Sequence, residues 1–78
     1  MIVKRSLAIR GHATSVSIED KFWNCLRAIA AARGLPLAAL VAEIDESRAP
    51  TTNLSSAIRL FVLDEALSRA DPSPGGRG

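Results

Sequence analysis

The chain has 78 residues, of which 47% are apolar and only 4% aromatic, and its formal net charge is +2. A chain of this length holds one domain, and the core of so small a domain is marginal without a covalent staple or a partner chain. One cysteine excludes an internal disulfide, and the sequence contains no spaced Cys and His set for zinc. We therefore expect an obligate oligomer with no metal and no cofactor.

The positive charge is concentrated at the amino terminus. Lys4, Arg5 and Arg10 all precede the first carboxylate, Glu19. Such a patch, doubled in a dimer, favours a polyanionic partner, although a short basic arm can also be merely solvated. No segment approaches the roughly 20 apolar residues of a membrane span, and the start does not resemble a signal peptide. We expect a cytoplasmic protein that does not bind membranes, and the lone cysteine agrees with a reducing compartment.

Residues 12–18 alternate with the period of a β-strand. One face would carry Thr14, Val16 and Ile18, and the other would carry Ala13, Ser15 and Ser17. Residues 3–10 also alternate, and Gly11 breaks the pattern. This upstream segment is expected either as a second extended piece or as a flexible basic arm, so that residues 1–11 form an arm that precedes the domain.

Helical spacing of apolar residues follows the strand. Ser17-Ile18-Glu19-Asp20 has the pattern of a capping box and predicts a helix over about 19–33, which Gly34 ends. Pro36 opens a second helix with an apolar stripe from Leu37 to Ile44. The segment 45–52 is expected as a linker.

Asn53 is predicted to cap a third helix, whose shared face includes Leu54, Ile58 and Val62. The domain would then span residues 12–69. Residues 70–78 are rich in Pro and Gly, have nothing to bury, and are expected to be disordered.

A single strand followed by helices leaves its ladder hydrogen bonds unmade. Pairing with the same strand of a second chain about a two-fold axis solves this, and it also gives two small chains one shared core. The residues expected in that dimer core are Val16, Ile18, Phe22, Trp23, Leu26, Leu40 and Ile44.

This order of elements resembles the ribbon-helix-helix family, the Arc and MetJ type of DNA-binding dimer. The resemblance covers about residues 4–68. Its first segment, Gly11-His12-Ala13-Thr14-Ser15, is similar to the Gly-His-x-Thr-Ser strand start of one bacterial group. The other segments that carry it are Arg33-Gly34-Leu35-Pro36-Leu37 and Asn53-Leu54-Ser55-Ser56. It implies a mostly α fold: an intertwined homodimer with a two-stranded antiparallel ribbon between subunits, plus an extra carboxy-terminal helix.

The resemblance also implies a site. The ribbon would enter the major groove of double-stranded DNA, and the start of the second helix would hold a phosphate. The DNA-binding residues carried over to this chain, together with its flanking cations, are Lys4, Arg5, Arg10, His12, Ala13, Ser15 and Ser17, and the phosphate clamp would be the backbone amides of Leu37 and Ala38. Ala13 stands where relatives often carry arginine, and Pro36 where they commonly carry serine.

These observations predict a DNA-binding transcriptional regulator, expected to be a repressor. They predict no enzyme, since no nucleophile–base set or phosphate loop is evident. The alternative is an interaction module or antitoxin whose ribbon reads DNA weakly or not at all. The third helix would pad the dimer core, join dimers into higher oligomers, or receive a partner protein. His12 is expected to fix the turn or contact DNA, and Cys25 to be a small buried thiol.

Overall fold

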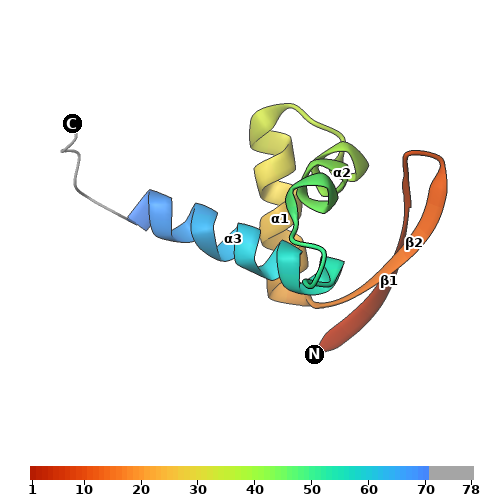
Figure 1. The fold of residues 1–78 in the computed structure, drawn as a ribbon. Coiled ribbons are helices and arrows are strands. Elements are labelled where there is room, and N and C mark those ends of the chain that lie inside the picture. The colour runs from red at the N-terminus through yellow and green to blue at the C-terminus, as the bar shows by residue number, and fades with distance from the viewer. Residues whose placement is uncertain (71–78) are drawn as a thin grey trace.

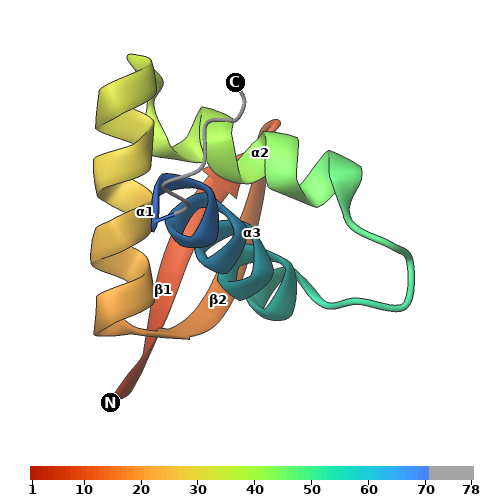
Figure 2. The same cartoon turned by 90° about the vertical axis from the view of Figure 1, so that its left-hand side faces the viewer.

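The computed structural model describes residues 1–70 and contains one hairpin followed by three helices (Figure 1). All three helices lie on one side of the hairpin, and its other side faces solvent (Figures 1 and 2). In chain order the elements are β1 (Ile2–Ile9), β2 (His12–Glu19), α1 (Asp20–Arg33), α2 (Leu37–Ser47) and α3 (Leu54–Ala70).

β1 and β2 pair antiparallel within one chain, with Ile2 opposite Glu19 and Ile9 opposite His12. Arg10 and Gly11 form the connection, and both have positive φ, 51° and 80°. Positive φ at both central residues is what a two-residue type I′ turn requires, and the twist of this turn matches that of the strands. We call the paired β1 and β2 the ribbon.

The ribbon corrects one step of the sequence argument. Residues 2–9 form a strand, so the prediction of a second extended segment is confirmed and the prediction of a flexible arm is wrong. The strand that starts at His12 therefore finds its ladder partner in its own chain, and an unpaired strand no longer requires a second copy. An intrachain turn of two residues closes the shortest possible loop, which keeps the entropic cost of pairing low.

α1 ends as expected but does not begin with the expected cap. Gly34 adopts the left-handed conformation, φ 69°, and its N–H and that of Leu35 donate to the carbonyls of Ala31 and Ala30 at 3.1 and 2.9 Å. This is a glycine-ended helix of the Schellman type. The predicted capping box is wrong: Ser17 is still part of β2, so the N-cap is Glu19, which makes no side-chain cap bond.

The two later helices have the expected starts. Pro36 is the N-cap of α2, and the Asn53 side-chain oxygen accepts a 2.8 Å bond from the Ser56 N–H at the start of α3. α2 continues to Ser47, so the first part of the predicted 45–52 linker is helical. The predicted disordered tail covers residues 70–78; Ala70 is the last residue of α3, and residues 71–78 lie outside the described residues.

Every element contributes to one apolar core. Fully buried side chains come from β2 (Val16, Ile18), α1 (Leu26), α2 (Leu40) and α3 (Ile58). Burial of one such side chain is worth about 1.5–3 kcal/mol. The residues assigned above to a dimer core are thus buried within one chain, apart from the half-buried Phe22, which packs against the core.

Cys25 is exposed, which contradicts the expectation of a buried thiol. It lies next to Leu26 in sequence, but consecutive helix residues point about 100° apart, so a core residue says little about its neighbour.

Among the described residues no single helix is long and apolar enough to cross a membrane. α1 and α2 pass the test of length and composition only when they are taken together, and they meet at a bend of 104°.

Replacing Gly11 tests the turn. Gly11→Ala should lower the free energy of unfolding by about 1–2 kcal/mol, because the Cβ of alanine makes the left-handed conformation unfavourable. No atom lies within 4 Å of the added Cβ, so the cost is conformational and not steric. Gly11→Asn should cost less, since asparagine tolerates positive φ. Urea unfolding of the three proteins measures this; equal loss in both variants would contradict it.

Candidate nucleic-acid interface

The solvent side of the ribbon carries mostly short side chains. The register places Lys4 opposite Ser17, Ser6 opposite Ser15, and Ala8 opposite Ala13. All six side chains are exposed, and we call this set the outer face. Successive side chains of a strand point to opposite sides, so the buried Val16 and Ile18 guarantee that their neighbours point outward.

The expected positions of Ala13, Ser15 and Ser17 on the exposed face are confirmed. Sequence reasoning missed Ser6 and Ala8, which β1 adds beside them. The alternation of residues 3–10 was the available signal, but without the partner strand nothing indicated that its even-numbered positions share a face with Ser15.

Arg5 is not on the outer face. Its neighbour across the ribbon is the buried Val16, so its side chain points toward the helices. There the guanidinium meets Asp20 Oδ1 at 2.6 Å and lies 4.9 Å from the centre of the Trp23 ring. Both contacts favour a cation at this place. Arg5 therefore fastens the ribbon to the first turns of α1.

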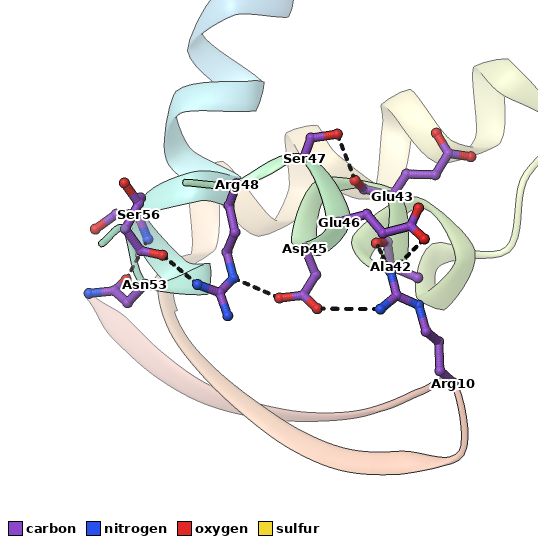
Figure 3. Close-up of polar contacts among 10 residues, drawn as sticks. Arg10, Ala42, Glu43, Asp45, Glu46, Ser47, Arg48, Asn53 and Ser56 are labelled. Carbon is purple, nitrogen blue, oxygen red and sulfur yellow. Dashed lines mark hydrogen bonds and ion pairs between the residues drawn. The ribbon is translucent and has the colours of Figure 1, made fainter. Parts of the chain in front are cut away.

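Arg10 fastens the tip of the ribbon to α2 (Figure 3). One terminal nitrogen donates to the Ala42 carbonyl at 2.9 Å and lies 3.4 Å from Glu46, and the other lies 3.8 Å from Asp45. Asp45 in turn accepts a 2.7 Å bond from Arg48. The positive charge of Arg10 is thus matched by carboxylates of its own chain.

α3 holds the other end of β2. The Ser17 N–H donates to Ser55 Oγ at 3.1 Å, and the Ser17 carbonyl accepts from Arg59 at 3.2 Å. Arg59 Nε also donates to Glu19 Oε1 at 2.8 Å. This bond, above all, holds the pKa of Glu19 below its ordinary value, because it stabilises the charged carboxylate.

Arg5 of β1, Arg10 of the turn and Arg59 of α3 therefore anchor the ribbon to α1, α2 and α3, and none of them belongs to the outer face. Of the three amino-terminal cations expected at DNA, only Lys4 lies on the outer face. His12 is exposed at the start of β2, beside the turn. Contact of any of these residues with DNA stays a prediction.

The proposed phosphate clamp is at the start of α2. The Pro36 carbonyl accepts from the N–H groups of Ala39 and Leu40, at 3.0 and 3.2 Å. The amides of Leu37 and Ala38 precede the first intrahelical bonds and remain available to an anion, as at any helix start. The ribbon reaches α2 at Ala42, Asp45 and Glu46, so no polar contact between described residues links the clamp to the outer face.

Within residues 1–70 no group of three or more His, Cys, Asp or Glu side chains could hold a metal ion. The site thus consists of the outer face of the ribbon and the start of α2. Short hydroxyl and methyl groups let the backbone of a ribbon approach a flat or grooved surface closely.

Comparison with known families agrees with this architecture. The model of the ribbon-helix-helix domain matches residues 2–66, which include β1, β2 and all of α1 and α2. The chain belongs to the ribbon-helix-helix family, whose members generally bind DNA in transcription regulators and typically dimerise. Searches of curated proteins and of solved structures found no match.

Acid should weaken the contact between Glu19 and Arg59. Because the folded-state pKa of Glu19 is lowered, this pair stabilises the fold above the ordinary carboxyl pKa and is lost as pH falls through the lowered value. Urea unfolding at about pH 7 and about pH 3 should show a smaller acid loss for Glu19→Gln than for the wild type. Glu43→Gln, which changes an acid outside the ion pairs of residues 1–70, is the control; an equal effect there would contradict the assignment.

Proposed function

We propose that the protein is a transcriptional repressor that binds DNA as a homodimer and places the outer face of each ribbon in the major groove. The observation that carries the proposal is the outer face itself: it is exposed and carries hydroxyl, methyl and amino groups, while arginines hold the ribbon to the helices. The major groove of B-DNA, about 12 Å wide, admits a two-stranded ribbon of this kind.

The outer face has the chemistry to contact base edges. Hydroxyls of Ser6, Ser15 and Ser17 can donate or accept, and the methyl groups of Ala8 and Ala13 fit beside a thymine methyl. Lys4, at the open end of the ribbon, is suited to a phosphate. Serine discriminates bases less sharply than the paired bonds of an arginine to guanine. We therefore expect the protein to recognise its DNA sequence through several weak contacts whose free energies add.

One observation favours the alternative, an interaction module or antitoxin whose ribbon reads DNA weakly. Arg5 and Arg10 are bound to Asp20, Asp45 and Glu46 of their own chain. Fewer cations then meet phosphates, and the electrostatic part of DNA affinity is correspondingly smaller.

Selection of random duplexes with the purified full-length protein distinguishes the two functions. Enrichment of a defined motif, with binding that weakens as salt rises, supports the regulator. Binding without any enriched motif, or no binding, supports the interaction module and contradicts sequence reading by the ribbon.

Ser15→Ala should weaken binding to a selected duplex by about two- to tenfold, the usual worth of one hydrogen bond. Ser6→Ala should act similarly, because Ser6 lies opposite Ser15 at the centre of the outer face. Ser68→Ala changes an exposed serine on α3 and should leave affinity unchanged. Fluorescence anisotropy titrations measure all three, and unaltered binding by both ribbon variants would sink the proposed reading face.

Lys4→Ala should reduce the slope of log affinity against log salt by about 0.9 for each chain, because one phosphate contact is lost. Arg27→Ala removes an exposed cation of α1 that is not part of the ribbon and is the matched control. Titrations at several salt concentrations give the slopes. A slope that stays the same in Lys4→Ala would place Lys4 away from the phosphates.

A further inference from the structure

α3 carries a row of exposed leucines. Leu60, Leu63 and Leu67 are 56%, 48% and 59% exposed, and the other large apolar side chains exposed within residues 1–70 are Met1 and Ile2. The spacing of three and four residues places the leucines on one side of the helix. A contiguous apolar row at the surface marks an interaction site more often than scattered apolar residues do.

The last turns of α3 have no cover within residues 1–70. Ile58 and Val62 are buried, and Glu65 is bonded to Arg33 at 2.7 Å, but residues 66–69 are exposed. Figure 1 shows α3 extending away from α1 and α2 toward its carboxyl end. A helical end without packing is marginally stable in water, so these turns gain from a partner.

The leucine row leads into a hollow between α2 and α3. The hollow has a volume of about 390 Å³, and its apolar lining includes Leu40, Ile44, Phe61 and Leu60, the first leucine of the row. The row and the hollow together form one surface, which we call the α3 surface. It belongs to the helical side of the ribbon, so an occupant leaves the outer face uncovered (Figures 1 and 2).

The α3 surface contains unmatched negative charge. Glu43 and Asp64 line the hollow, and they are the acidic side chains of residues 1–70 that form no ion pair. Asp64 also lies beside the leucine row, because it follows Leu60 by four residues and precedes Leu67 by three. Two carboxylates thus stand at the edge of an apolar surface without a cation to match them.

The cations of residues 1–70 do not supply that match. Arg48 also lines the hollow, but it is bonded to Asp45 and to the Thr52 carbonyl, both at 2.7 Å. Arg69 follows Leu60 by nine residues, so it lies about 180° around the helix from the leucine row. A second copy docked through the same surface would add carboxylates and no cation. The charge therefore favours a partner of different, basic chemistry.

We propose that the α3 surface docks a basic amphipathic helix of another protein. The row extends about 10 Å along the axis from Leu60 to Leu67, which suits an elongated occupant better than a compact small molecule. A helix presents apolar anchors every three or four residues, so one anchor enters the hollow and the next ones lie along the leucines. Lysine or arginine side chains beside these anchors reach Glu43 and Asp64. This inference goes beyond DNA binding and does not depend on it.

Titration of the full chain with two synthetic helical peptides tests the proposal. Both peptides have roughly 18 residues, about five turns, with leucines at spacings of three and four. One carries lysines beside the leucines, and the other carries glutamates at the same positions. The lysine peptide should bind at least tenfold more tightly in fluorescence anisotropy titrations. Equal binding of the two peptides, or binding of neither, would overturn the proposal.

Removing the acids tests the charge of the site. Asp64→Asn and Glu43→Gln should each weaken binding of the lysine peptide by roughly two- to fivefold, the usual worth of one exposed ion pair. Asn24→Lys is the matched control, because it raises the net charge by the same amount at an exposed position of α1. An equal loss in Asn24→Lys would indicate general charge attraction and contradict docking at the hollow.

Removing a leucine tests the apolar row. Leu63→Ser should weaken binding of the lysine peptide by about tenfold, because it removes apolar surface that the peptide covers. Ile2→Ser changes an apolar residue of similar exposure, 57%, at the start of β1 and should leave binding unchanged. Circular dichroism and urea unfolding check that both variants remain folded. A folded Leu63→Ser protein that binds the peptide like the wild type would refute the assignment of the row.

Other occupants of the α3 surface give different results. If Leu63→Ser weakens self-association of the full chain in sedimentation velocity, the row belongs to a second copy. If the wild type binds phosphatidylcholine vesicles and Leu63→Ser does not, the row belongs to a lipid surface. Either result overturns the proposal. Binding of the lysine peptide by a protein that selects no DNA motif supports this inference and contradicts DNA reading by the ribbon.

Discussion

The ladder between β1 and β2 is the constraint on which the rest of this structure depends. It is closed by Arg10 and Gly11, whose positive φ values bring Ile9 and His12 face to face. Once the register is set, the period-two alternation determines which side of the ribbon each side chain faces. Val16 and Ile18 must enter the core, and the serines must face solvent. The helices then cover only the apolar side, and the other side remains open for a ligand.

The arginines connect this ladder to the helices. Arg5, Arg10 and Arg59 each bring a guanidinium to carboxylates on the helical side or at the rim of the ribbon. These partly exposed pairs contribute modestly to stability, but their position matters for function. They fix the tip and both strands of the ribbon relative to α1, α2 and α3, and they leave an outer face whose one charged member is Lys4.

Local signals in the sequence predicted much of this fold. The helix end at Gly34, the cap at Asn53 and the facing of Ala13, Ser15 and Ser17 all depend on residues close in the chain. The prediction of a capping box was wrong because the strand continues through Ser17, and a four-residue pattern cannot reveal whether its first residue belongs to the strand or to the helix. The prediction that Cys25 is buried was wrong because burial depends on which side of α1 packs against the core.

Amino-acid sequence alone determined the family resemblance, the helices and the alternation of the strand, since these follow from side-chain size, backbone preference and short-range hydrogen bonds. Only the tertiary structure decided that β1 pairs with β2 in the same chain and that Arg5 and Arg10 have partners of their own. The ion pairs of Arg5 with Asp20 and of Arg59 with Glu19 join residues 15 and 40 positions apart, and no local pattern specifies them. The sequence therefore places positive charge at the amino terminus, and the fold pairs the charges of Arg5 and Arg10 with carboxylates of the same chain.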